Sequence, residues 1–151
     1  SILVKEIIEY GLNTQLYNIK VIVTDSAKVF SDMKFGEEKD SYKNFCLENE
    51  VEIYTDIDEW DQWKSNSKVL HIDIRKWADI LLLAPLSSNT LAKIANGICD
   101  NLLTCVVKAW EFGKKPVFYA LGMNTQMYNN IHTEKHREFL SKDLFCYEIP
   151  V

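Results

Sequence analysis

The run Ala78–Ala84 (ADILLLA) is the sequence feature that most restricts the fold. It is nearly continuous in apolar residues, which is typical of a parallel strand covered on both faces. Pro85 follows directly. Because proline has no N–H to donate to a neighbouring strand, we expect this strand to end at Ala84. The run therefore predicts a central strand in an α/β sheet.

Shorter patterns on both sides of this run alternate between helix and strand. Gly11 predicts the end of a first helix, and Thr133 predicts the cap of the last one. A weak helical piece lies near residues 41–47. The remaining elements follow apolar spacing: helices at 2–10, 69–77, 88–96 and 101–110, and strands at 19–24, 51–54 and 116–121. This order predicts an α/β fold with a doubly wound, largely parallel sheet.

Both ends of the chain differ from what such a sheet normally shows. The chain begins on a helix, whereas a first helix is usually preceded by a strand and a phosphate-binding turn. It stops at Glu148–Val151, which has the pattern of a strand. We therefore expect residues 1–151 to be a single domain that lacks its first strand and turn and a C-terminal segment.

Composition excludes several classes of protein. A net charge of −5 disfavours binding to nucleic acid, which requires a basic surface. The longest apolar run is too short to span a membrane, and no signal peptide is visible, so we expect a cytoplasmic protein with no membrane partner. The four cysteines form no CxxC pair and have no metal-ligand spacing with the histidines, so no metal is predicted. Cys99 and Cys105 are expected to be reduced thiols in the core.

Polar residues follow three of the predicted strands. Ligands of open α/β sheets collect at the carboxyl ends of the strands, which here selects the loops at 24–26, 85–90 and 122–128. Their hydroxyl and amide groups suit a flat, polar-edged ring or a phosphate, although helix capping alone explains the second loop equally well. The candidate ligand-binding side chains in the first two loops are Thr24, Asp25, Ser26, Ser87, Ser88, Asn89 and Thr90.

His71 is the strongest candidate for a general base, because imidazole titrates near neutral pH. A structural histidine beside apolar residues is the alternative interpretation. The acidic segment 56–61 is better explained as a solvated loop than as a metal site, and His132 and His136 as a solvated helix face. The four tryptophans are too scattered to stack nucleic-acid bases and indicate core or subunit contacts.

Two segments carry a resemblance to a known family. Residues 69–110 (VLHIDIRKWADILLLAPLSSNTLAKIANGICDNLLTCVVKAW) resemble the core of the flavin-containing cysteine decarboxylases, and in particular the eukaryotic phosphopantothenoylcysteine decarboxylases. Residues 123–128 (MNTQMY) resemble the second signature of that family. The likeness extends over nearly the whole chain and is weakest between residues 30 and 50.

The resemblance implies a flavodoxin-like homotrimer that binds FMN between subunits and shares its active sites. The implied reaction converts 4'-phosphopantothenoylcysteine to 4'-phosphopantetheine in coenzyme A biosynthesis, with FMN oxidising the thiol to create an electron sink for decarboxylation. His71 matches the catalytic histidine, and Asn124 matches the residue that holds the substrate carboxylate. Gly122 and the seven loop side chains named above match flavin contacts.

The chain departs from the family pattern at several places. Leu121, Tyr128 and Ile131 replace a proline, a tryptophan and a second proline of the second signature. The family's proton-donating cysteine lies on a flap beyond Val151, and Cys146 does not match it. A partial-site or non-catalytic subunit that regulates a protein phosphatase is therefore an alternative. A related flavin prenyltransferase or peptide cysteine decarboxylase is a third possibility that fits the segment around His71 less well.

Overall fold

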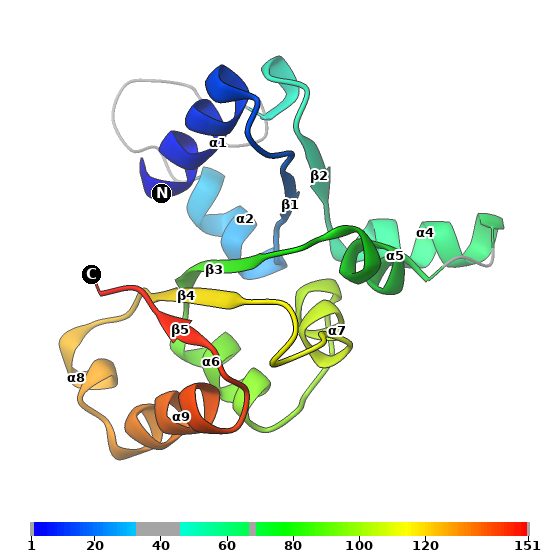
Figure 1. The fold of residues 1–151 in the computed structure, drawn as a ribbon. Helices are drawn as coiled ribbons and strands as arrows, with labels where there is room; N and C mark the ends of the chain where they lie inside the picture. Colours follow the sequence, from blue (N-terminus) through cyan, green and yellow to red (C-terminus); the bar gives the residue numbers. More distant parts are fainter. Residues whose placement is uncertain (1, 33–45, 67–68, 151) are drawn as a thin grey trace. The chain divides into compact units, whose positions relative to one another are not determined.

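Parallel strand pairing organises both parts of the chain in the computed structural model (Figure 1), which describes residues 2–32, 46–66 and 69–150. The chain divides into two units. Unit 1 comprises residues 1–70 and 101–103, and unit 2 comprises residues 71–100 and 104–151. Every strand pair in either unit is parallel, which confirms the predicted α/β class with a parallel sheet.

Unit 1 is built on two short strands and the helices around them. Strand β1 (Lys20–Ile22) pairs with β2 (Glu52–Tyr54). Helix α1 spans Ile2–Thr14, α2 spans Asp25–Asp32 and α4 spans Asp56–Asn66. The buried side chains of Ile8, Cys46 and Val51 form the core of this unit, with Ile19, Val21 and Ile53 packed against it. The predicted helical piece at 41–47 lies mostly outside the described residues.

Helix α1 does not end at Gly11, so that prediction is wrong. The ring of Tyr17 packs against the helix at this point, where a Cβ on Gly11 would lie 2.4 Å from Tyr17 Cε2. The Tyr17 hydroxyl donates a hydrogen bond to the carbonyl of Ile7 at 2.8 Å. Gly11 is therefore needed for a close side-chain approach within the helix and does not terminate it.

The acidic segment after β2 forms helix α4, which corrects the prediction of a solvated loop. Three carboxylates lie in its first turn, where they interact favourably with the helix dipole. Asp58 Oδ2 accepts hydrogen bonds from the backbone N–H and the hydroxyl of Thr55 at 2.6 and 2.8 Å. Asp56 Oδ1 accepts the N–H of Leu102 at 2.7 Å. These carboxylates hold helix ends, and their role in capping explains the acidic pattern.

Unit 2 contains the strand order β3-β4-β5. Strand β3 spans Leu81–Leu86, β4 spans Val117–Leu121 and β5 spans Tyr147–Glu148. The prediction that Pro85 ends its strand is wrong, because Pro85 lies inside β3. The pairing of β3 with β4 is irregular between Leu83 and Leu86, so the ladder does not require an N–H at position 85. The peptide bond between Ala84 and Pro85 is cis.

Helices α6 (Ser88–Ala95) and α9 (Ile131–Lys142) pack on each other on one side of this sheet (Figure 1). The other helices with residues in unit 2 are α5 (Leu70–Trp77), α7 (Leu102–Lys108) and α8 (Thr125–Tyr128), of which α5 and α7 begin with residues assigned to unit 1. The predicted cap of the last helix is wrong. Asn130 caps α9, whereas Thr133 is buried and donates its hydroxyl proton to the carbonyl of Met127 at 2.6 Å.

The cysteines and tryptophans only partly follow the sequence predictions. All four thiols are free, and Cys46 and Cys146 are buried. Cys99 is exposed and Cys105 is partly exposed, so the prediction that both lie in the core is wrong. Trp110 is buried, whereas the other three tryptophans are exposed. Among the described residues, no helix is long and apolar enough to cross a membrane.

Candidate functional site

The carboxyl ends of β3 and β4 lie side by side in unit 2. The N–H of Gly122 donates to the carbonyl of Leu86 at 2.9 Å, which brings the loop after β4 next to the start of α6. Ser87 caps α6, with its Oγ accepting the N–H of Thr90 at 3.3 Å and lying 3.1 Å from Thr90 Oγ1. The structure therefore brings together the predicted residues 87–90 and 122 at one edge of the sheet.

Gly122 permits a close approach of the two strand ends. A Cβ at this position would lie 2.7 Å from Cβ of Pro85, a distance that real Cβ atoms do not tolerate. Any other residue would push β3 and β4 apart at their tips. The neighbouring side chains at positions 87–90 are those of Ser87, Ser88, Asn89 and Thr90. They offer hydroxyl and amide groups, and none of them is charged. This donor set fits the polar edge of a flat heterocycle such as a flavin.

Asn124 lies just beyond Gly122 and caps helix α8. Its Oδ1 accepts the N–H of Met127 at 2.9 Å, so the oxygen end of this amide is occupied by the fold. The Nδ2 end has two protons to donate, and Asn124 is exposed. The cap therefore fixes the oxygen end of the side chain and leaves the donor end available.

A network of polar side chains supports the loop that carries Asn124. The guanidinium of Arg137 donates two hydrogen bonds to Glu148, both at 2.8 Å, and lies 4.8 Å from the ring centre of Tyr128. The Tyr119 hydroxyl donates to Glu148 at 3.0 Å, and burial raises the pKa of Tyr119. Tyr128, which stands at the tryptophan position of the second signature, is thus held by a cation–π contact with Arg137.

This network was missed in the sequence, because its members come from β4, α8, α9 and β5 and share no local spacing. Ile131, which stands where the family has a second proline, is the first residue of α9 after its cap Asn130. Proline is common at that helix position, so its replacement leaves the helix start intact.

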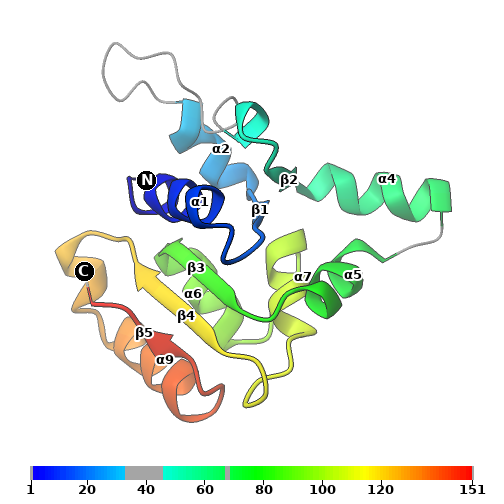
Figure 2. The same cartoon turned by 45° about the horizontal axis from the view of Figure 1, so that its top comes forward.

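His71 lies at the other end of unit 2. It is the second residue of α5, a helix that leads into the amino end of β3. Figures 1 and 2 both show α5 at this end of the sheet and α8 at the opposite end. The side chain of His71 is partly buried. Within one chain, the structure does not bring His71 together with Asn124.

The remaining predicted residues belong to unit 1, at the carboxyl end of β1. Thr24 Oγ1 accepts the N–H of Ala27 at 3.3 Å, and Asp25 forms an ion pair with Lys28 at 2.8 Å. Ser26 is exposed in the first turn of α2. Residues 24–26 therefore lie at the start of helix α2, just as residues 87–90 lie at the start of helix α6. Among the described residues, no group of three His, Cys, Asp or Glu side chains has the arrangement of a metal site.

The flavoprotein family model matches residues 1–150, so the chain belongs to the flavoprotein family. Within that family it is similar to phosphopantothenoylcysteine decarboxylases. It is 48% identical over 124 residues to a phosphopantothenoylcysteine decarboxylase from Arabidopsis thaliana, and the match covers 82% of this chain and 54% of that protein. The chain spans about half the length of the curated relatives it matches.

Solved structures give the same relationship. A mutant PPC decarboxylase complexed with pantothenoylaminoethenethiol superimposes with a TM-score of 0.78 at 43% identity, over 95% of this chain and 74% of that one. The FMN binding protein AtHal3 superimposes with a TM-score of 0.76 at 43% identity, over 95% and 73% of the two chains. These likenesses confirm the predicted flavodoxin-like fold.

Proposed function

We propose that this chain acts in the FMN-dependent decarboxylation of 4'-phosphopantothenoylcysteine to 4'-phosphopantetheine, a step of coenzyme A biosynthesis, in the cytoplasm. The observation that carries the proposal is the combination of family membership with a fixed amide donor, Asn124, beside a polar strand end. The similarity to a PPC decarboxylase that binds pantothenoylaminoethenethiol supports the substrate class.

Residues 87–90 and Gly122, which the structure brings together at the strand ends of unit 2, would hold the flavin. A bound flavin supplies reversible two-electron redox chemistry, which gives the substrate's thiol-bearing end an electron sink for the departing CO₂. The fit rests on the uncharged donors at the strand tips and on the close approach that Gly122 permits.

His71 would accept the proton of the substrate thiol. A free thiol has a pKa of about 8.5 and is mostly protonated at neutral pH, so a neighbouring imidazole nitrogen that accepts its proton would help to form the thiolate. Asn124 would donate from Nδ2 to the substrate carboxylate and hold it until CO₂ leaves. These two side chains then act on the two ends of the cysteine moiety.

The separation of His71 from Asn124 supports an assembly of several copies, which we propose to be a homotrimer with shared sites. A single active site needs both side chains near one small substrate, but α5 and α8 lie at opposite ends of unit 2 (Figures 1 and 2). A neighbouring copy that presents its α8 to α5 would complete the site. The same reasoning allows a partial-site subunit, whose neighbour is a different chain of the same family.

The proposal is tested with the purified full chain, supplied with FMN and 4'-phosphopantothenoylcysteine. We expect a yellow, flavin-loaded protein that releases CO₂. His71→Asn is expected to retain the flavin spectrum and to lower the rate by about 10² to 10⁴-fold, the usual contribution of a general base. A preparation that takes up no FMN, or a His71→Asn variant with full activity, would contradict the assignment. Activity that appears only after mixing with a relative would favour the partial-site subunit.

The role of Asn124 can be separated from its role as a cap. Aspartate and serine are both good N-cap residues, so Asn124→Asp and Asn124→Ser should both retain α8. Asn124→Asp places a negative charge beside the substrate carboxylate, and we expect the larger increase in KM for this variant. Asn124→Ser replaces the two amide donors with a shorter hydroxyl, adds no charge and serves as the matched control. Unchanged substrate affinity in both variants would contradict the carboxylate contact.

A further inference from the structure

The last carbonyls of helix α5 are held by one side chain from a distant part of the chain. Lys115 Nζ donates hydrogen bonds to the carbonyls of Ala78, Arg75 and Lys76 at 2.6, 3.1 and 3.3 Å. Carbonyls at a helix C-terminus lack partners within the helix and attract a positive charge. The ammonium of Lys115 therefore replaces the missing turn of α5.

The backbone of Lys115 is itself anchored. The carbonyl of Lys115 accepts a hydrogen bond from Nε1 of Trp110 at 3.0 Å, and the N–H of Lys115 donates to the carbonyl of Glu111 at 3.1 Å. The ammonium also lies 5.7 Å from the ring centre of Trp110, whose side chain is only 5% exposed. A buried ring thus fixes the segment 110–115 that presents the ammonium to α5.

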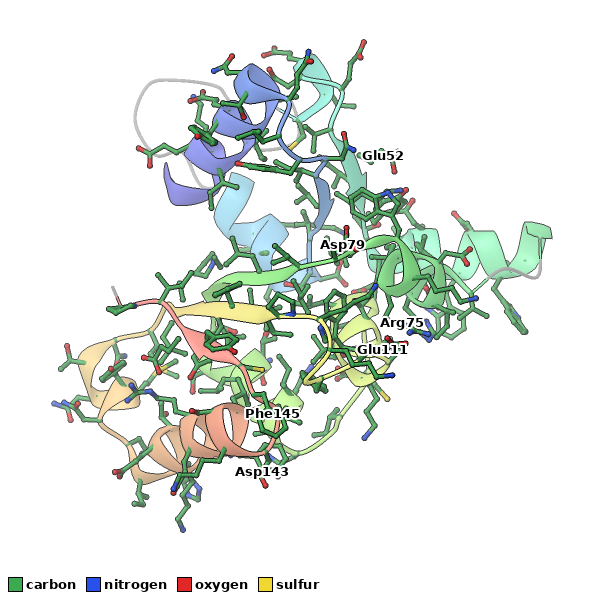
Figure 3. All side chains as sticks on the ribbon, viewed as in Figure 1. Glu52, Arg75, Asp79, Glu111, Asp143 and Phe145 are labelled. Atoms are coloured by element: carbon green, nitrogen blue, oxygen red, sulfur yellow. The ribbon has the colours of Figure 1, made fainter. Side chains whose placement is uncertain are left out.

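A second contact joins the same two segments. The guanidinium of Arg75, on α5, forms an ion pair with the carboxylate of Glu111, and the two side chains point toward one another in Figure 3. Arg75 is 19% exposed, so this pair is partly shielded from water. We call Lys115, Glu111 and Arg75 the α5 clamp.

We propose that Lys115 is a positioning residue, which through the α5 clamp sets the orientation of the helix that carries His71. This inference rests on the proposed role of His71 as the base. Helix α5 has only two turns, and His71 lies about 8 Å along the axis from Lys76 at a rise of about 1.5 Å per residue. If the C-terminal end of so short a helix tilts, the ring of His71 near its N-terminal end therefore moves relative to the substrate.

Lys115→Met tests this proposal, because methionine retains most of the apolar stem and removes the three donors. Lys114→Met is the matched control, since Lys114 is an exposed neighbour in the same turn. In the full chain loaded with FMN, we expect Lys115→Met to lower kcat by roughly 10- to 100-fold, the effect of a misplacement of about 1 Å. KM for 4'-phosphopantothenoylcysteine and the flavin content should remain near those of the control.

Two further measurements separate positioning from a general loss of structure. Hydrogen exchange of the α5 amides should become faster in Lys115→Met than in Lys114→Met, while exchange in α9 stays unchanged. Lys115→Arg, which restores a cation with several donors, should recover part of kcat. If Lys115→Met does not fold, Glu111→Gln removes the charge that pairs with Arg75. We expect this variant to lower kcat as well, but by a smaller factor.

The possible results are distinguishable. An active parent protein whose Lys115→Met and Lys114→Met variants have equal kcat values would overturn the positioning role and leave the proposed function intact. Equal α5 exchange in the two variants would also overturn it. A parent protein that binds FMN but releases no CO₂ would remove the proposed function, and the positioning role of Lys115 would fall with it.

Discussion

Units 1 and 2 are built on the same parallel pairing but differ in how much they bury. Among the described residues, unit 1 has five buried apolar side chains beside two three-residue strands: Ile8, Cys46, Val51, Leu70 and Leu102. Unit 2 has buried side chains on all its longer elements: Ile74, Leu83, Leu86, Leu91, Ile94, Val106, Val107, Trp110, Val117, Tyr119, Ala120, Leu121, Leu140 and Cys146. Most candidate site residues belong to unit 2, where more contacts hold them in place.

An ion pair in unit 2, between Arg137 and Glu148, is also better shielded from water than the pair that joins β1 and β2 in unit 1. In unit 2, the side chains of Arg137 and Glu148 are 32% and 24% exposed and share two hydrogen bonds. In unit 1, Lys20 pairs with Glu52, whose side chain is 57% exposed. Exposed ion pairs contribute little to stability because water and salt screen them. Arg137 and Glu148 therefore hold their part of unit 2 more firmly than Lys20 and Glu52 hold the pair of β1 and β2.

Each unit contains a buried thiol that can report on its opening. Cys46 belongs to unit 1 and Cys146 to unit 2. Burial raises the pKa of both thiols, that of Cys146 to about 11. Because thiol reagents attack the thiolate, neither should react until its surroundings open. Pulsed labelling followed by mass spectrometry therefore measures the two units separately.

The largest effect is expected from Ile8→Ala in the small core. Ile8 is fully buried, and truncation of such a side chain costs about 2–5 kcal/mol. We expect Cys46 to be labelled much faster in this variant, with a smaller change at Cys146. Leu12→Ala, at an exposed position of the same helix, is the control and should label as the parent does. Equal acceleration at both thiols would show that the units do not differ in the way described.

Arg137→Met should have the next largest effect, this time in unit 2. It leaves the partly buried carboxylate of Glu148 with only the Tyr119 hydroxyl, and hydrogen bonds to charged groups contribute about 1.5–3 kcal/mol. Urea unfolding with Cys146 labelling measures the loss. Lys142→Met removes the exposed pair with Glu138 on the same helix and should change nothing measurable. A similar loss in both variants would contradict the special role of Glu148.

A smaller, pH-dependent effect should appear in unit 2. Burial, and then the nearby charge of His132, lower the pKa of His136 from its ordinary value of 6.5. The folded state thus binds the proton less tightly than the unfolded state, so stability is complete above pH 6.5 and falls as the pH drops through the lowered pKa. His136→Gln should flatten this part of the stability profile. An unchanged profile in that variant would assign the acid sensitivity to another group.

The smallest effect should appear in unit 1 at lower pH. Hydrogen bonds from Lys20 and Tyr54 lower the pKa of Glu52 from 4.5. Its contribution is present above pH 4.5 and is lost as the pH falls through the lowered pKa. Because Glu52 is exposed, we expect its carboxylate to contribute less than about 1 kcal/mol to the free energy of unfolding. Urea unfolding followed by circular dichroism between pH 5 and 3 should show the loss in the parent and not in Glu52→Gln.

Apolar periodicity was sufficient to predict the parallel strands and most helices. Strands β3 and β4 and helices α5, α6 and α7 were expected close to their observed positions, because each repeats apolar residues with a clear period. Helix α4 was missed because its carboxylates act as caps, one of them toward Leu102, 46 residues away. Pro85 fits within β3 because the pairing with β4 is irregular between Leu83 and Leu86. This irregularity depends on the partner strand, so the local sequence does not predict it.

The candidate site was predictable in its residues but not in its arrangement. The hydroxyl and amide side chains at the strand ends follow from the topology rule for α/β sheets. That Asn124 caps α8 was not predicted, because residues 122–128 were expected to be a loop and the four-residue helix α8 was missed. The contacts of Lys115 with α5 join residues almost 40 positions apart, and a lysine in a polar turn carries no hint of them.

The two ends of the Asn124 amide have different tasks, since one maintains the turn and the other faces outward. Aspartate and serine at this position can still accept the N–H of Met127 and so keep the cap of α8, while they change the group that faces outward. If Asn124 contacts the substrate as proposed, either substitution would therefore change the group offered to the ligand while the cap of α8 is retained.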